Sequence, residues 1–225
     1  MIPKIIHYCW FGRKEKPREV YKYIDTWRKK MPNYEIQEWN EDNFDVNAIP
    51  FTRDAYKAKK FAFVSDYARL WALYNVGGIY FDTDVEVIKS FDNLLDKPAF
   101  IGYEEDYAFC TAVIGAEAKN KFIEEFMTYY NNKDFNINKL VPNPSICTNI
   151  LKKKGIILNN KNYIYENILY IYSSDYFSVK KYLQSSYTIT NNTYSIHHFA
   201  TTWLPRRTKY KAWLIRRIKN LFNYK

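Results

Sequence analysis

The sequence predicts an α/β fold in which a mixed β-sheet is flanked by helices. The chain opens with a strand, a helix and a second strand, the order in which a doubly wound sheet begins. A long amphipathic helix farther along leads directly into an apolar strand. With 225 residues, 47% of them hydrophobic and 19% aromatic, the chain can bury the core of such a domain and is not a disordered protein.

The first three elements follow from local patterns. Residues 5–11 are almost wholly apolar and are predicted to form a buried strand. We do not interpret this run as a signal peptide, because no basic leader precedes it. Residues 18–30 place apolar side chains on one helical face, and residues 34–39 alternate like a second strand.

The clearest pattern lies in the middle of the chain. A helix is predicted over residues 55–76, and Gly77-Gly78 ends it because glycine tolerates the left-handed backbone that follows a helix. Residues 79–87 then alternate as a strand. Asp82 and Asp84 fall on one side of this otherwise apolar strand, and two acids at such positions require an explanation.

The second half of the chain is less informative. Strands are predicted over residues 100–103 and 111–114, and a helix over residues 118–130. Residues 152–187 contain short strand-like runs whose order the pattern does not give. Three cysteines at no metal-like spacing, namely Cys9, Cys110 and Cys147, indicate buried thiols in a reducing compartment.

The net charge of +10 is concentrated at the C-terminus. Residues 206–225 contain eight Lys or Arg and no acid, which leaves +2 for residues 1–205. We therefore expect one α/β domain over residues 1–205 and a basic amphipathic helix over residues 206–225. Such a helix suits an anionic membrane surface. The alternative is a helix that docks on its own domain or on a partner subunit.

Asp82 and Asp84 are the strongest candidates for chemistry. They bracket one residue, so on an extended chain both carboxylates project to the same side. Hard oxygen ligands of this kind bind Mn²⁺ or Mg²⁺, and the metal can neutralise the charge on a departing nucleoside diphosphate. An isolated Asp-x-Asp is more often a solvated turn, but the position after a helix and an apolar strand favours a metal site.

The preceding helix adds Ser65, Asp66 and Arg69, whose spacings of three and four residues place them on one face. Asp66 can pair with Arg69 and still offer an oxygen to a sugar hydroxyl. The alternative is an ion pair that only stabilises the helix.

Residues 63–69 and 77–84 together resemble the signature of the DXD-containing glycosyltransferases of family 32, which include capsular-polysaccharide transferases and mannosyltransferases. The catalytic domains of clostridial glucosylating toxins are more distantly similar. The resemblance extends to residues 2–12 and 198–203. It implies a GT-A fold and a retaining, metal-dependent transfer of a hexose from a nucleotide sugar, with UDP-sugars favoured, to a glycan or lipid-linked acceptor in surface polysaccharide synthesis.

The resemblance also implies roles for matching positions. Trp10 would stack on the donor base, and Tyr80 would pack near the nucleotide. Asp82 would reach the ribose and the metal, and Asp84 would bind the metal directly. The donor sugar and ribose would be held by Ser65, Asp66 and Arg69.

A late histidine would complete the metal site. Spacing to Trp203 favours His198 over His197, and Thr201 and Trp203 would close over the diphosphate. Residues 143–148 loosely resemble an acceptor-side loop. No residue stands out as a nucleophile, although the acidic run of residues 104–106 follows a strand and is either part of the site or a solvated loop.

The sequence fits two other classes of function less well. A metal-dependent nucleotidyl or phosphoryl transferase would carry a glycine-rich phosphate loop, and no such motif is present. A nucleic-acid-binding protein would carry basic residues throughout the chain, whereas residues 1–205 are nearly neutral. We therefore expect a cytoplasmic glycosyltransferase, peripheral at the inner face of the membrane, that binds no nucleic acid.

Overall fold

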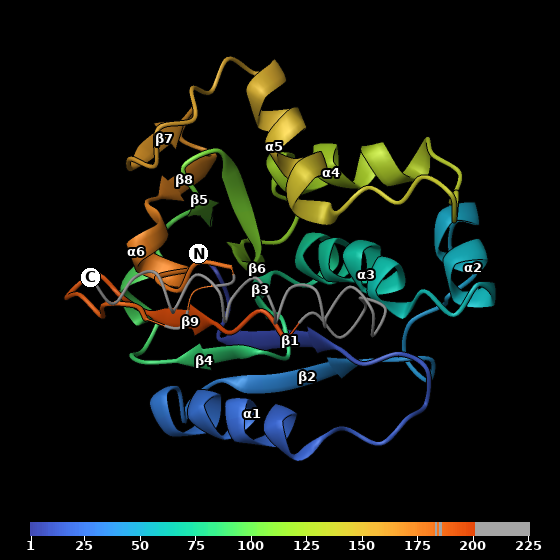
Figure 1. Cartoon of the computed structure of the whole chain (residues 1–225), viewed down its shortest axis with the longest axis horizontal. Coiled ribbons are helices and arrows are strands. Elements are labelled where there is room, and N and C mark those ends of the chain that lie inside the picture. The colour runs from blue at the N-terminus through green and yellow to red at the C-terminus, as the bar shows by residue number, and fades with distance from the viewer. Residues whose placement is uncertain (183, 185, 201–225) are drawn as a thin grey trace.

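The computed structural model describes residues 1–182, 184 and 186–200. Helices cover both faces of a seven-stranded sheet, and a two-stranded sheet lies beside it (Figure 1). The predicted tail, residues 206–225, lies outside the described residues. In the part of the chain that the structure describes, no helix is long and apolar enough to cross a membrane.

The main sheet is mixed, with the strand order β2-β1-β3-β6-β5-β8-β7. β1 pairs in parallel with β2 and β3, and β5 pairs in parallel with β8, whereas the remaining pairs are antiparallel. The small sheet pairs β4 with β9 in antiparallel orientation. The strands are β1 (Ile5–Cys9), β2 (Glu35–Trp39), β3 (Gly78–Phe81), β4 (Val85–Val87), β5 (Ala99–Glu105), β6 (Ala108–Ala116), β7 (Tyr163–Tyr165), β8 (Leu169–Tyr172) and β9 (Ser195–His197).

The helices form the outer layers (Figure 1). α1 packs on the face that carries the small sheet, where the Trp27 indole donates to the Val85 carbonyl at 2.8 Å. α3 packs on the opposite face, and α4 packs on α3. The helices are α1 (Arg18–Lys30), α2 (Pro50–Lys57), α3 (Phe61–Asn75), α4 (Lys121–Asn131), α5 (Asn143–Lys153) and α6 (Ser174–Phe177), with a short 3-10 turn at Asp92–Leu94.

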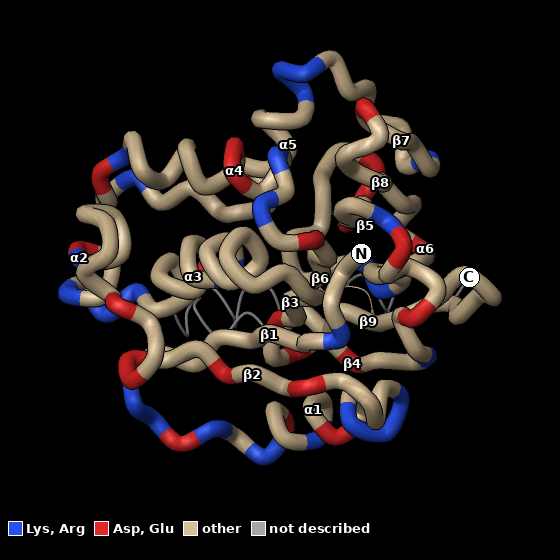
Figure 2. The backbone as a smooth tube through the Cα atoms, turned by 180° about the vertical axis from the view of Figure 1, so that it is seen from behind, with Lys and Arg blue, Asp and Glu red and all other residues tan. Residues whose placement is uncertain are grey.

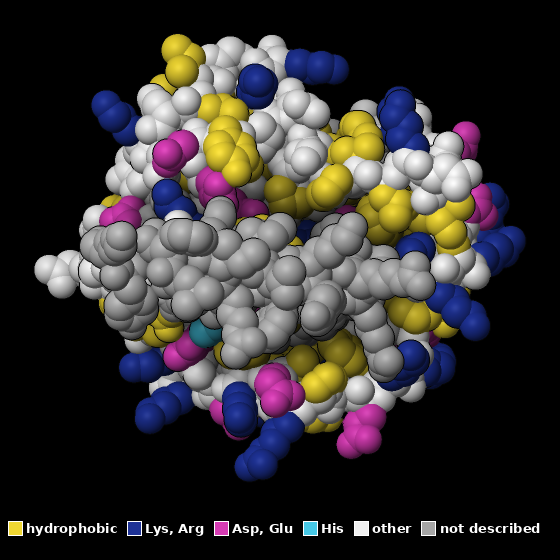
Figure 3. All heavy atoms as spheres, in the orientation of Figure 1, with side chains coloured by type: hydrophobic (Ala, Val, Ile, Leu, Met, Phe, Trp, Pro, Cys, Tyr) yellow, Lys and Arg dark blue, Asp and Glu magenta, His cyan; other side chains and the backbone are white. Residues whose placement is uncertain are grey.

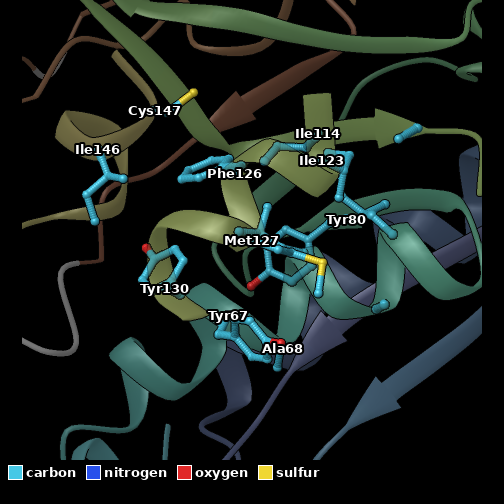
Figure 4. Packing of buried hydrophobic residues seen from close by; sticks show 14 of the residues in the cluster. Tyr67, Ala68, Tyr80, Ile114, Ile123, Phe126, Met127, Tyr130, Ile146 and Cys147 are labelled. Carbon is cyan, nitrogen blue, oxygen red and sulfur yellow. The ribbon is translucent and has the colours of Figure 1, made fainter. Parts of the chain in front are cut away.

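Two buried apolar clusters hold these layers together, one on each face of the sheet. On the α3 face, aromatic side chains from α3 and α4 meet, and Tyr130 packs edge-on against Tyr67 with ring centroids 6.2 Å apart (Figure 4). Ile146 and Cys147 bring α5 onto the same cluster. The predicted α/β mixed sheet is confirmed, and the predicted helix over residues 18–30 has the bounds of α1.

The single helix predicted over residues 55–76 is wrong, because the chain forms α2 and α3 there. Lys59 has a positive φ of 56°. Its N–H donates to the Tyr56 carbonyl at 2.9 Å, and the N–H of Lys60 donates to the Ala55 carbonyl at 2.9 Å. This pair of bonds is a Schellman motif, which ends α2. Lysine gives no signal for that motif, whereas glycine would.

The strand predicted over residues 79–87 is also interrupted. Strand β3 of the main sheet ends at Phe81, and the N–H of Val85 donates to the Asp82 carbonyl at 3.1 Å to close a turn. The chain then enters β4 of the small sheet. Likewise, residues 143–148 are not a loop but the first turns of α5. Asp82 and Asp84 therefore meet through a turn and not through strand alternation.

The charges of the described chain are distributed and not gathered on one element. Lys and Arg occur near α1, α2 and α5, at separate places on the molecule (Figure 2). A nucleic-acid groove needs a continuous basic stripe. The described residues form no such stripe along a single helix or strand.

Candidate active site

The carboxyl ends of three neighbouring parallel strands meet at one edge of the sheet. β2 ends at Trp39, Trp10 follows β1, and Asp82 follows β3. The backbone N–H of Trp10 donates to the Trp39 carbonyl at 2.9 Å, which continues the pairing past the strand. In open α/β sheets, ligands bind at this edge.

The turn that leads into β3 is built on two glycines. Gly77 and Gly78 have positive φ values of 75° and 120°. A Cβ on Gly78 would lie 2.6 Å from the Ile5 carbonyl and 2.8 Å from Nε2 of His7. His7 accepts from the Trp39 indole at Nδ1 and therefore donates from Nε2 to the Gly77 carbonyl, at 3.1 and 2.7 Å. Burial lowers the pKa of His7, so it holds the turn as a neutral residue.

Arg69 is the centre of the buried polar network, with 5% of its surface exposed. It donates to Oδ1 of Asp66 at 2.9 Å, to the Thr111 carbonyl at 2.8 Å and to the Ser65 carbonyl at 3.3 Å. Burial raises the pKa of Asp66 to about 7, although the charge of Arg69 opposes this shift. The guanidinium is thus committed to protein partners.

Asp82 is held by two of its neighbours. The Tyr80 hydroxyl donates to Oδ1 of Asp82 at 2.8 Å, and the Arg69 guanidinium lies 3.2 Å from the same oxygen. Arg69 also lies 4.5 Å from the centre of the Tyr80 ring, a cation–π contact. Because only 2% of its surface is exposed, the Tyr80 side chain is fixed in the core, and its hydroxyl holds Asp82 in one orientation.

Asp84 joins the turn to the end of β9. Its Oδ1 lies 3.4 Å from Nε2 of His197, and its Oδ2 accepts from the backbone N–H of Ala200 at 2.7 Å. The Asp84 carbonyl accepts from the N–H of His198 at 3.0 Å. Burial opposes ionisation of both partners, but their mutual attraction prevails: the pKa of Asp84 is lowered and that of His197 is raised.

His197, not His198, is the histidine that lies beside the aspartates. The side chain of His198 points elsewhere: its Nε2 lies 2.8 Å from a Glu86 oxygen, and its ring stacks on Tyr23 with centroids 4.9 Å apart. Spacing to Trp203 favoured His198, whereas the side chain that lies beside the aspartates is that of His197. The informative signal was the strand itself, because adjacent residues of a strand face opposite sides.

The residues present fit a divalent cation. Ligand atoms of Asp82, Asp84 and His197 all lie within 4.8 Å of one another. Two carboxylates and one imidazole are a donor set that suits Mn²⁺ well and Mg²⁺ less well, because imidazole favours transition metals. A second group shares the same histidine, with Glu104 and Cys110.

Glu104 follows the buried part of β5 and is part of this environment. Burial raises its pKa to about 6, while the charge of His197 opposes the shift. The acidic run of residues 104–106 is therefore divided: Glu104 lies in the site, and Asp106 is exposed. The sequence alone left these alternatives open.

The remaining predicted residues are placed as follows. The Trp10 indole donates to the Lys14 carbonyl at 2.6 Å, at the edge of the parallel strands. The Ser65 hydroxyl donates back to the Phe61 carbonyl at 3.2 Å. Thr201 and Trp203 lie outside the described residues.

Comparison with known families gives a match to the profile described as "Glycosyltransferase sugar-binding region containing DXD motif", over residues 17–101. This range contains α1, α3, β3 and the Asp82–Asp84 turn. It does not contain the histidines of the C-terminal segment.

Two curated proteins show the range of similarity. Glucan organizing enzyme 1 of Cryptococcus neoformans var. grubii is 34% identical over 86 residues, covering 34% of this chain and 24% of that protein. Inositol phosphoceramide mannosyltransferase 1 of Schizosaccharomyces pombe is 25% identical over 163 residues, covering 64% of this chain and 47% of that protein. The chain thus spans less than half the length of these relatives.

Solved structures support the fold. "PaToxG Glycosyltransferase" superposes with a TM-score of 0.54 at 23% identity, covering 68% of this chain and 70% of that one. A glycosyltransferase involved in the glycosylation of the major capsid of PBCV-1 superposes with a TM-score of 0.50 at 11% identity, covering 89% and 95%. The fold is that of the GT-A glycosyltransferases, and residues 17–101 of the chain are similar to the sugar-binding region that contains the DXD motif.

Proposed function

We propose that this chain catalyses a divalent-metal-dependent transfer of a hexose from a nucleotide sugar to a glycan or lipid-linked acceptor. The observation that carries the proposal is the meeting of Asp82, Asp84 and His197 beside the buried Asp66–Arg69 pair. The metal, when bound, would offset the negative charge that develops on the departing diphosphate.

The protein side chains have distinct roles in this proposal. Asp82, Asp84 and His197 would hold the cation, with Arg69 and Tyr80 fixing the orientation of Asp82. Oδ2 of Asp66 makes no hydrogen bond within the described residues, so it can accept one from a hydroxyl of the donor sugar. We assign Arg69 to positioning, because its donors already have partners.

The finer identity of the reaction is part of the same proposal. Trp10 would stack on the donor base at the strand edge, and base–aromatic stacking contributes roughly 1–3 kcal/mol. We favour UDP-sugars, but one similar protein is named a mannosyltransferase of a phosphoceramide, so GDP-mannose belongs in the test. A retaining reaction, a role in surface polysaccharide synthesis and a peripheral membrane position through residues 206–225 complete the proposal.

A thermal-shift panel of UDP- and GDP-sugars, with and without Mn²⁺, tests it. We expect one donor to raise the Tm of the wild type only when Mn²⁺ is present. Asp84→Asn should abolish that shift, whereas Glu86→Gln, a matched change on the neighbouring strand, should preserve it. If folded wild type shows no metal-dependent shift with any donor, the proposed function is wrong.

A further inference from the structure

An apolar groove with a basic rim runs along α4 and α5, and none of the candidate metal ligands lines it. Two hollows of about 380 and 180 Å³ adjoin there. Both are lined by Tyr129, Val141 and Ile146, so they form one continuous groove, which we call the α4–α5 groove. In Figure 3, hydrophobic side chains gather over this part of the molecule, with Lys and Arg around them.

The charged side chains around the groove are mostly positive. Its lining includes Lys133 and Lys139 in the connection from α4 to α5, and Lys152 and Lys153 at the end of α5. All four are exposed, and Asp134 is the acid among the lining residues. An apolar floor beneath a cationic rim complements a molecule with an apolar chain and an anionic head.

The groove is joined to the donor side of the molecule. Phe63 lines it and lies on α3, three residues before Asp66. Tyr130 accepts a hydrogen bond from Nδ2 of Asn143 at 2.6 Å, which ties the end of α4 to the start of α5. The groove therefore shares the helix α3 with Asp66 and Arg69.

We propose that the α4–α5 groove binds an anionic phospholipid, with an acyl chain on the apolar floor and the phosphate at the lysines. This inference goes beyond the proposed function, which concerns the aspartates. A glycan acceptor alone would need many polar side chains, yet the floor is formed by residues such as Val141, Ile146 and Ile150. A nucleic acid would need exposed stacking aromatics, whereas Phe51 and Phe63 are both buried.

Binding of short-chain phospholipids to the full chain tests this inference. Dihexanoyl phosphatidylglycerol supplies the anionic head, and dihexanoyl phosphatidylcholine is the zwitterionic control. Both are titrated below their micelle concentrations by calorimetry. We expect at least tenfold tighter binding of the anionic lipid, and weaker binding of glycerol 3-phosphate, which has the head group without the chains.

Charge reversal then locates the site. Lys152→Glu with Lys153→Glu, and separately Lys133→Glu with Lys139→Glu, should each weaken binding of the anionic lipid about tenfold. The matched control, Lys29→Glu with Lys30→Glu, changes the same charge on exposed lysines of α1. It should leave the affinity within about twofold.

Several results would overturn the inference. These are equal binding of the two lipids, no binding of the anionic lipid, or equal losses in the groove and control variants. Unchanged binding in both groove variants would assign the lipid to another surface, such as residues 206–225. The Mn²⁺-dependent donor shift, measured on the same samples, should persist in every variant, so its failure would count against the proposed function and not against the groove.

Discussion

In the candidate donor site around Asp66, Arg69 and Asp82, which we call the donor region, charged side chains are largely buried and paired with one another. Along the α4–α5 groove they are exposed around an apolar floor. Arg69 has 5% of its surface exposed and contacts two carboxylates. Lys152 and Lys153 are exposed on their helix. The same chemical class of residue therefore serves two purposes: rigid orientation in the first region and attraction of a charged ligand in the second.

This difference has a consequence for mutagenesis. A buried charge that loses its partner destabilises the fold, because desolvation is no longer offset. An exposed lysine can be reversed with little effect on folding, because water and salt screen its charge. Substitutions in the donor region should change stability and function together, and those at the groove should change binding alone.

The largest expected effect on stability is that of Arg69→Ala. The substitution leaves Asp66 and Asp82 without their buried partner, so we expect a loss of about 3–5 kcal/mol in the free energy of unfolding. Urea denaturation measures it. Arg53→Ala is the matched control, because Arg53 pairs with Asp54 in an exposed salt bridge at 2.8 Å. Comparable losses in the two variants would show that the Arg69 network is not special.

The adjacent histidines give the next comparison. His197→Gln should weaken Mn²⁺ binding at least about 10–100-fold, the usual cost of losing even an outer-shell partner of a metal. His198→Gln breaks the contact with Glu86 and should change the affinity little. Electron paramagnetic resonance of free Mn²⁺ measures both. A larger loss of affinity in His198→Gln than in His197→Gln would assign the metal to His198, as the spacing to Trp203 predicts.

The sequence predicted what depends on local pattern. The strand, helix and strand at the start, the glycine pair and the two aspartates follow from periodicity and from the conformational range of glycine. The break at Lys59 did not, because a lysine with positive φ has no composition signal. The choice between His197 and His198 depends on the pairing of β4 with β9, which are far apart in the chain.

The α4–α5 groove could not be predicted from the sequence for the same reason. Residues 143–148 begin with Asn-Pro, which suggests a loop, yet Pro144 occupies the first turn of α5, where a missing N–H costs nothing. Only the tertiary structure, in which α5 packs on β6 and is joined to α4 by the Asn143–Tyr130 hydrogen bond, brings Tyr129 and Ile146 to one surface. Long-range packing, and not local propensity, creates this surface.

Asp66 adds a dependence on pH to the donor region. Its pKa is raised by burial to about 7, compared with about 4 in an unfolded chain. The protonated form therefore stabilises the fold fully below about pH 4, and the contribution is lost as the pH rises through about 7. Asp66→Asn removes this term. From pH 4.5 to 7.5, urea midpoints should shift in favour of the variant relative to wild type; a constant difference would contradict the assignment.

The smallest effect concerns the thiols, which lie in both apolar clusters. Cys9, Cys110 and Cys147 are free and buried. Burial raises the pKa of Cys9 to about 12 and that of Cys147 further still, so neither forms the reactive thiolate at neutral pH. A disulfide reagent at pH 8 should label the native protein negligibly and all three thiols after unfolding. Rapid labelling of the native protein would show that a cluster opens.

Release of nucleoside diphosphate from the donor found in the thermal-shift panel tests the central claim most directly. The account predicts that wild type releases it only with Mn²⁺, and that Asp84→Asn slows release by roughly 10²–10³-fold, as expected when one preorganised electrostatic partner of a developing charge is lost. Glu86→Gln should remain close to wild type. Equal rates in Asp84→Asn and wild type, or undiminished release after chelation of the metal, would contradict it.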